Sequence, residues 1–218
     1  MNNIKIAPSI LSADFAKMGE AVIDLCNKGA DLVHCDVMDG VFVPNITFGI
    51  KMIADIKKVS TIPLDVHLMI VEPERYLEEF AKAGADIITV HYEACKKPVA
   101  EVLDEIRKLG VKSAVSIKPD TPVSVLEELI PHCDMILIMS VYPGYGGQKY
   151  IPESTERIAK TYQMIKESGL NVMLEVDGGI KSSNVKEVKD AGADVIVAGS
   201  SVFNAEDMEK AIKELREN

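Results

Sequence analysis

The sequence predicts an α/β protein that folds as a single (β/α)8 TIM barrel over residues 1–218. The chain has 218 residues, and a barrel of eight strand–helix units usually needs about 200–250. Short apolar segments alternate with amphipathic segments along the whole chain, which is the pattern of repeated βα units. A weak internal repeat, in which a Gly and an Asp precede an apolar run, recurs at 28–37, 83–92 and 191–200, with a looser copy at 132–141.

Eight apolar segments are the expected strands. They are continuous apolar runs rather than strict alternations of apolar and polar residues, which is typical of parallel strands that are buried on both faces. In chain order they lie at 4–10, 28–37, 62–69, 83–92, 111–117, 132–141, 171–179 and 191–200.

Amphipathic segments between these runs are the expected helices. Either Ser12 or Asp14 can cap the first one, and Pro73 suits the first turn of another. In chain order the helices are expected at 15–28, 49–58, 73–83, 99–109, 124–130, 153–168, 183–191 and 205–218. The alternative fold is a doubly wound open sheet. It is disfavoured because it usually has fewer strands and because no G-x-G-x-x-G follows the first strand.

The composition limits the partners and the location of the protein. The net charge is −10, which argues against nucleic acid or an anionic membrane as the main partner. No apolar run approaches the roughly 20 residues that span a bilayer, and the first residues do not resemble a signal peptide. The four cysteines are scattered, so they are expected to be reduced thiols in a cytoplasmic protein.

Polar residues gather at the ends of several predicted strands, where barrels of this type hold their active sites. His34 and Asp36 are two residues apart on one strand, so their side chains face the same way. If that face is the barrel interior, His67 and Asp177 can join them from other strands. Two imidazoles and two carboxylates suit one divalent transition ion such as Zn, Fe, Mn or Co.

Other polar residues near these strand ends are open to two interpretations. The side chains of Asp65 and Glu175 face the same side as the predicted ligands His67 and Asp177, but each lies two residues earlier on its strand and so deeper in the barrel. They either orient a ligand or fill a layer of the barrel interior. His91 ends a strand close to the site but is not expected to be a ligand. His132 lies at the opposite end of the barrel and is expected to be structural. Cys35 should point away from its neighbours, toward a helix.

Small residues follow three of the predicted strands, at 141–150, 177–180 and 198–201. Glycine-rich loops and helix N-termini present backbone N–H groups to anions. These loops therefore predict a phosphate site, and the longest of them can close as a lid.

Three methionines, Met38, Met69 and Met139, lie at or just beyond the ends of strands. Flexible Met side chains often fill gaps in a core. Their position favours a soft apolar cover over a bound substrate, with core filling as the alternative.

Taken together, these segments closely resemble the ribulose-phosphate 3-epimerase family along essentially the whole chain. The matching segments are APSILSADF (7–15), HCDVMDGVFVPNITFG (34–49), LDVHLM (64–69), PGYGGQKYIP (143–152), EVDGGI (175–180) and AGSSVF (198–203).

The resemblance implies a metal-dependent isomerase of the pentose phosphate pathway that interconverts D-ribulose 5-phosphate and D-xylulose 5-phosphate. The reaction would be a two-base proton transfer at C3 through a metal-stabilised enediolate. Asp36 and Asp177 would be the acid/base pair on opposite faces of the substrate, and they would bind one metal together with His34 and His67. Ser9 and His67 would contact the substrate, and no organic cofactor is expected.

The resemblance also implies the kind of phosphate site and the assembly. The phosphate loops would be of the ribulose-phosphate-binding type, after the sixth, seventh and eighth strands. The residues that would hold the phosphate end are Gly144, Tyr145, Gly146, Gly147, Gly178, Gly179, Gly199 and Ser200. The protein would be a homo-oligomer, either a dimer or a hexamer.

Three residues near the substrate rim depart from the family pattern. Tyr142 stands where the family often has Asn or Glu, Tyr145 where it often has Phe, and Lys118 where Asn is common. These departures leave open a 3-epimerase of a ketohexose phosphate such as D-allulose 6-phosphate. Two alternatives of other classes are a barrel lyase or synthase, which shares the phosphate loops, and a non-catalytic sugar-phosphate-binding barrel.

Overall fold

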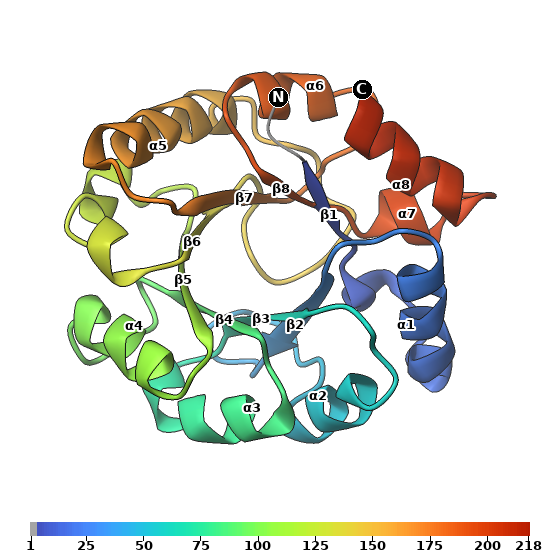
Figure 1. Cartoon of the computed structure of the whole chain (residues 1–218), viewed down its shortest axis with the longest axis horizontal. Coiled ribbons are helices and arrows are strands. Elements are labelled where there is room, and N and C mark those ends of the chain that lie inside the picture. Colours follow the sequence, from blue (N-terminus) through green and yellow to red (C-terminus); the bar gives the residue numbers. More distant parts are fainter. Residues whose placement is uncertain (1–3) are drawn as a thin grey trace.

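The computed structural model describes residues 4–218 and has eight parallel strands inside a ring of helices (Figure 1). The order of the strands in the sheet is β1-β8-β7-β6-β5-β4-β3-β2, so strands that follow one another in sequence lie side by side. This arrangement confirms the predicted TIM barrel. The strands are β1 (Lys5–Ala7), β2 (Val33–Met38), β3 (Leu64–Met69), β4 (Ile87–His91), β5 (Lys112–Ile117), β6 (Met135–Met139), β7 (Met173–Asp177) and β8 (Val195–Val197).

The barrel closes between β1 and β2 through a short contact just beyond β1. Ser9 and His34 form an isolated parallel bridge, and the backbone N–H of His34 donates to the carbonyl of Pro8 at 3.1 Å. β1 is shorter than the predicted 4–10 because Pro8 has no N–H to donate to a ladder. From Ile10 the chain turns into the 3-10 helix η1 (Ile10–Ser12).

Helices follow the strands as the alternation predicted, except between β5 and β6, and a short helix at 200–203 was not predicted. The helices are α1 (Met18–Asn27), α2 (Ile50–Lys57), α3 (Leu77–Ala83), α4 (Val99–Lys108), α5 (Ser154–Ser168), α6 (Val185–Asp190), α7 (Ser200–Phe203) and α8 (Met208–Glu217). Two expected helices begin with a 3-10 turn, namely η2 (Phe15–Lys17) before α1 and η3 (Pro73–Arg75) before α3. Asp14 caps η2, as the sequence allowed, by accepting the N–H of Ala16 at 3.0 Å.

The α-helix predicted at 124–130 is wrong. Two 3-10 turns stand in its place, η4 (Val123–Leu126) and η5 (Ile130–His132). Pro131 cannot donate a hydrogen bond, and it disfavours the helical conformation of the residue before it. The apolar pattern that predicted the helix still serves the core, because Leu126 and Ile130 are buried.

The core has an outer layer between strands and helices and an inner layer inside the barrel. Cys35 lies in the outer layer, as its place next to two inward-facing residues predicted. An apolar cluster inside the barrel consists of Ala7, Leu32, Ile87, Ala114, Met135, Val195 and Val197. Most of these residues lie at the N-terminal end of the strands, whereas Ala7 and Val197 are the last residues of β1 and β8. The polar side chains that face the barrel interior lie closer to the C-terminal ends of the strands.

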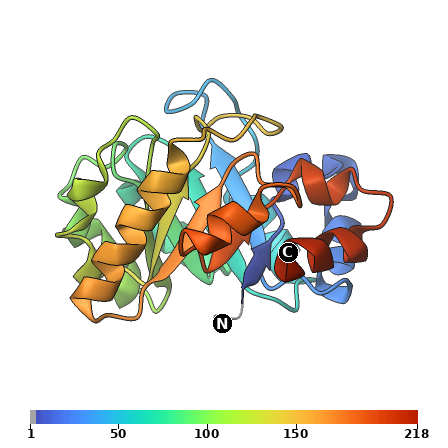
Figure 2. The same cartoon turned by 90° about the horizontal axis from the view of Figure 1, so that it is seen from above.

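The loops after β2 and β6 project together from one end of the barrel (Figure 2). A side-chain bond links them, because the Asn45 amide donates to the carbonyl of Gly144 at 2.9 Å. In the described part of the chain, no helix is long and apolar enough to cross a membrane.

Candidate metal centre and active site

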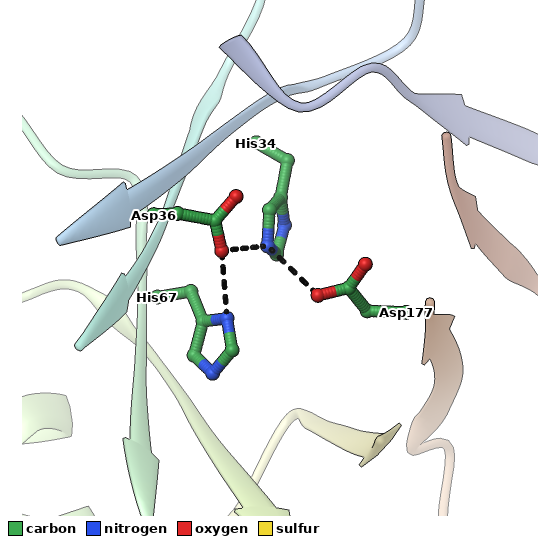
Figure 3. Close-up of side chains that lie close together, drawn as sticks. All are labelled: His34, Asp36, His67 and Asp177. Carbon is green, nitrogen blue, oxygen red and sulfur yellow. Dashed lines mark hydrogen bonds and ion pairs between the residues drawn. The ribbon is translucent and has the colours of Figure 1, made fainter. Parts of the chain in front are cut away.

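Four predicted side chains converge inside the barrel (Figure 3). His34 and Asp36 come from β2, His67 from β3 and Asp177 from the last position of β7. Asp36 Oδ1 lies 3.3 Å from His34 Nε2 and 3.2 Å from His67 Nδ1. Asp177 Oδ2 lies 3.9 Å from His34 Nε2. One ligand-type atom from each of the four residues lies within 4.8 Å of all the others.

The hydrogen bond of His34 indicates that this cluster attracts a cation. His34 Nδ1 lies 2.5 Å from Asp65 Oδ2. Because a carboxylate only accepts, a ring proton belongs on Nδ1. Burial alone would lower the pKa of His34, but the charges of Asp36 and Asp65 raise it well above its ordinary value. Nε2 has no hydrogen-bond partner among residues 4–218, yet it faces the carboxylates of Asp36 and Asp177. Carboxylates gathered in a buried place are unfavourable unless a positive charge lies among them, which a proton on His34 or a bound metal ion would supply.

The spacing of the donor atoms fits a divalent transition ion. Four ligands placed tetrahedrally at about 2.1 Å from an ion are about 3.4 Å apart. The distances from Asp36 Oδ1 to His67 Nδ1 and His34 Nε2, 3.2 and 3.3 Å, and from His34 Nε2 to Asp177 Oδ2, 3.9 Å, are close to that value. Nitrogen and carboxylate oxygen are also the donor types that such ions accept.

The two aspartates of the cluster have opposite proton affinities. Burial alone would raise the pKa of Asp36, but the charge and hydrogen bonds of His34 and His67 hold it well below its ordinary value. Burial and the neighbouring charge of Asp36 raise the pKa of Asp177 from 3.8 to about 6. Two carboxyl groups whose environments push their pKa values apart are the usual arrangement for an acid and a base.

Ser9 holds the other oxygen of Asp36. Its hydroxyl donates to Asp36 Oδ2 at 2.5 Å, which leaves Oδ1 facing the two histidines. Ser9 is positioned for this by the bridge that closes the barrel between β1 and β2. The residue predicted to contact substrate therefore also orients one of the predicted acid/base groups.

A second carboxyl pair lies beneath the cluster. Asp65 and Glu175 are fully buried, and Thr89 donates to Asp65 Oδ1 at 3.3 Å. Asp65 bonds His34, which favours ligand orientation over layer filling. Burial and the charge of Asp65 raise the pKa of Glu175 well above its ordinary value, which favours the protonated form of Glu175.

A cavity of about 110 Å³ opens above the cluster. This is room for several water molecules or for part of a small ligand. The predicted residues that line it are Ser9, Asp36, Met38, Met69, Met139, Gly144, Tyr145, Gly146, Gly147, Asp177, Gly178, Gly179, Gly199 and Ser200. His34 and His67 do not line the cavity; both are fully buried behind its wall.

The loops after β6 and β7 require glycine where they pass each other. Gly179 has φ +68°, and a Cβ there would lie 2.3 Å from the backbone nitrogen of Tyr150. Gly178 has φ +123°, and a Cβ there would lie 2.5 Å from the side chain of Val141. Only glycine tolerates both the backbone conformation and the close approach, so the DGGI segment keeps the backbone at the cavity wall.

Several lining residues were not predicted from the sequence. Ser12, Gln148 and Lys181 line the cavity, and Lys181 is its only cationic side chain among the described residues. Lys181 follows the DGGI segment directly, which is a signal that could have identified it. Gln148 donates to the carbonyls of Tyr142 and Tyr145 at 2.6 and 2.9 Å and so fixes the loop after β6.

The departures at the rim differ in their relation to the cavity. Tyr142 lines it, and its hydroxyl donates to Asp120 at 2.7 Å. Lys118 does not line it, because its Nζ lies 3.8 Å from the centre of the Phe42 ring. Of the two, only Tyr142 therefore contributes to the wall of the cavity.

Comparison with known proteins gives consistent matches along the chain. The sequence model of the Ribulose-phosphate 3 epimerase family matches residues 5–203. A ribulose-phosphate 3-epimerase from Synechocystis sp. is 53% identical and covers 98% of this chain and 94% of its own length. One from Bacillus subtilis is 48% identical with 98% of both chains covered, and one from Escherichia coli is 45% identical with 99% and 96% covered.

Solved structures with little sequence similarity share the fold. A mutant tryptophan synthase α-subunit from Pyrococcus furiosus superposes with a TM-score of 0.72 at 17% identity and covers 99% of both chains. KGPDC from Streptococcus mutans superposes with a TM-score of 0.73 at 11% identity, with 97% of this chain and 95% of that chain covered.

Proposed function

The chain belongs to the ribulose-phosphate 3-epimerase family, and we propose that it is the isomerase that interconverts D-ribulose 5-phosphate and D-xylulose 5-phosphate. His34, Asp36, His67 and Asp177 would hold one divalent transition ion, drawn from Zn, Fe, Mn and Co. The observation that carries this proposal is the pair of aspartates, from β2 and β7, that share one buried centre while their pKa values are shifted in opposite directions.

Epimerisation next to a ketone requires a proton to leave one face of the carbon and another to arrive on the opposite face. In this proposal Asp36, whose lowered pKa keeps it ionised, removes the proton in one direction of reaction. Asp177, whose raised pKa favours the protonated form, delivers a proton to the other face, and the roles exchange in reverse. When bound, the divalent ion supplies positive charge that stabilises the negative charge developing on the substrate oxygens.

Ser9 would keep the base in position by donating to Asp36 Oδ2. The apolar side chains of Met38, Met69 and Met139 would cover the reacting carbon and exclude water, since all three line the cavity. A water-poor site strengthens the interaction between charged groups.

The glycine-rich segments on the cavity wall would hold the phosphate end through backbone N–H groups. The residues proposed for this are Gly144, Tyr145, Gly146, Gly147, Gly178, Gly179, Gly199 and Ser200. Support comes from their common place around the cavity and from the positive φ of Gly178 and Gly179. The argument for a ketohexose phosphate substrate is weaker than the sequence suggested, because Lys118 contacts Phe42 and does not line the cavity.

We also propose that residues 1–218 act as one domain in a homo-oligomer, a dimer or a hexamer, in the cytoplasm. The four cysteines are free, which agrees with a reducing compartment. Light scattering during size-exclusion chromatography would give the number of subunits.

The proposed function is tested by following ribulose 5-phosphate in D₂O by NMR with metal analysis of the same sample. Formation of xylulose 5-phosphate with deuterium at C3 is expected, with loss on chelation and recovery on adding back the native ion. The same measurement on D-allulose 6-phosphate tests the ketohexose alternative. Bound metal without exchange at C3 would favour a non-catalytic sugar-phosphate-binding protein.

A further inference from the structure

The second ring nitrogen of His67 does not face the metal centre but another histidine. His67 Nε2 lies 2.8 Å from His91 Nε2, and the two rings stack with centroids 5.0 Å apart. Both side chains are fully buried. The sequence placed His91 near the site without a role, and the contact gives it a direct hydrogen bond to a proposed ligand.

The hydrogen bonds continue from His91 to a carboxylate. His91 Nδ1 lies 3.3 Å from Glu93 Oε2. The other oxygen of Glu93 accepts from the backbone N–H of Lys118 at 2.8 Å and from the hydroxyl of Thr121. Burial alone would raise the pKa of Glu93, but these hydrogen bonds lower it to about 2. Glu93 is therefore an ionised acceptor that is held at both oxygens.

The carboxylate of Glu93 determines which atom donates and which accepts in each of these hydrogen bonds. Because Glu93 can only accept, His91 carries its proton on Nδ1 and presents a lone pair at Nε2. His67 must then donate from Nε2. Its Nδ1, which forms a 3.2 Å hydrogen bond with Asp36 Oδ1 in the metal-free structure, would then carry the lone pair for the ion in the metal-bound protein.

We propose that His91 and Glu93 are positioning residues that fix His67 in the tautomer whose Nδ1 can bind the metal. This inference rests on the proposed function, in which His67 is a metal ligand. Ligating histidines commonly donate their other N–H to a partner that sets the ring orientation and the tautomer. For His34 that partner is the carboxylate of Asp65, at 2.5 Å. For His67 it is an imidazole that a carboxylate orients in turn.

Two neighbouring side chains cover this pair. The Phe42 ring lies 4.8 Å from the His91 ring, centroid to centroid, and Lys118 Nζ lies 3.8 Å from the centre of the Phe42 ring. Phe42 therefore covers His91, and the Lys118 ammonium interacts with the Phe42 π-system. The departure at Lys118 is thus explained by the layer over His91 rather than by substrate contact.

The proposal is tested by Zn²⁺ affinity of the full chain, measured by competition with a chromogenic chelator. His91→Leu removes the acceptor and should weaken Zn²⁺ binding by about 10–100-fold. His91→Gln places an acceptor oxygen near the position of Nε2 and should restore most of the affinity. His132→Leu is the matched control, because His132 also bonds a carboxylate, Asp104 at 3.0 Å, but lies at the opposite end of the barrel.

Glu93→Gln tests the hydrogen bond between Glu93 and His91 without changing a fully buried ring. One amide oxygen cannot serve both Lys118 and His91, so the amide N–H would face His91 Nδ1 and move the His91 proton to Nε2. That proton would oppose the Nε2 proton of His67, and Zn²⁺ binding should weaken by about 10–100-fold. This variant decides the matter if His91→Leu does not fold.

Nitrogen-15 correlation spectra of the Zn²⁺-loaded wild type report the tautomers directly. Protons on His67 Nε2 and His91 Nδ1 are expected, and a proton on His91 Nε2 would overturn the proposal. Wild-type affinity in both His91→Leu and Glu93→Gln would also overturn it. If His67→Gln binds Zn²⁺ as well as the wild type, the metal site of the proposed function fails instead. If only His67→Gln weakens binding, the metal site stands and the positioning role is wrong.

Discussion

Asp177→Asn should make the metal-free protein more stable at pH 8, although it removes a proposed catalytic group. Burial and the charge of Asp36 raise the pKa of Asp177 from 3.8 to about 6. A difference of one in pKa corresponds to 1.36 kcal/mol, so the ionised carboxylate destabilises the folded chain by on the order of 3 kcal/mol. Asparagine keeps the shape of the side chain and carries no charge.

The sign of this effect depends on pH. Below the unfolded pKa of about 3.9 the carboxyl group is protonated in both states and carries no penalty. Between that pH and about 6 the folded chain binds more protons than the unfolded chain, so the stability of the wild type falls as pH rises. Above about 6 the penalty is complete. The advantage of Asp177→Asn should therefore be small at pH 4.5 and reach its full size at pH 8.

Urea unfolding after chelation, followed by circular dichroism at both pH values, measures the effect. A gain on the order of 3 kcal/mol corresponds to a rise of about 6–12 °C in Tm for a chain of this size. Zn²⁺ at 100 times its Kd should stabilise the wild type by about 2.7 kcal/mol and the variant by less. A variant that is no more stable than the wild type at pH 8, or that gains equally at both pH values, would refute the reasoning.

Three further predictions follow from the same geometry. Asp36→Asn and Asp177→Asn should each lower kcat by about 10²–10⁴-fold in the C3 exchange assay, and unchanged rates in both would contradict the paired mechanism. Zn²⁺ affinity should fall by at least about tenfold per pH unit below pH 6, because protons compete with the ion for Asp177 and His34. Calorimetric titrations between pH 5 and 8 measure this, and a flat profile would contradict it. Gly179→Ala should destabilise the protein by at least about 1–3 kcal/mol, since its φ is positive and its Cβ would meet backbone. Gly146→Ala is the control in the same urea experiment, because its φ is not positive and the added Cβ would make only an ordinary 3.7 Å contact with the Ser12 hydroxyl. Equal losses in both variants would contradict the steric argument.

The side of the strand to which the metal-centre residues point was predictable from their spacing in the sequence. Side chains two apart on a strand face the same side, so His34 and Asp36 had to point together. The fold class then placed strand ends at one mouth of the barrel. The structure brings His67 and Asp177 to the same point, with 3.2 and 3.9 Å to their nearest partners in the cluster.

The helix expected at 124–130 shows where the apolar pattern was not sufficient. Leu126 and Ile130 are buried as the pattern required, but Pro131 prevents a continuous helix. Apolar spacing reports which residues face the core, and the backbone conformation between them depends on hydrogen bonds that proline cannot make.

The sequence by itself determined the barrel, the inward-facing residues and the glycines that the loops require, because each depends on periodicity or on the allowed backbone angles of one residue. The tertiary structure alone decided the hydrogen-bonded chain from Glu93 through His91 to His67. It also decided that Lys118 lies over Phe42 rather than in the cavity. The physical reason is that distances across a barrel follow from the tilt and stagger of its strands. Two residues on neighbouring strands therefore meet at a point that neither local sequence specifies.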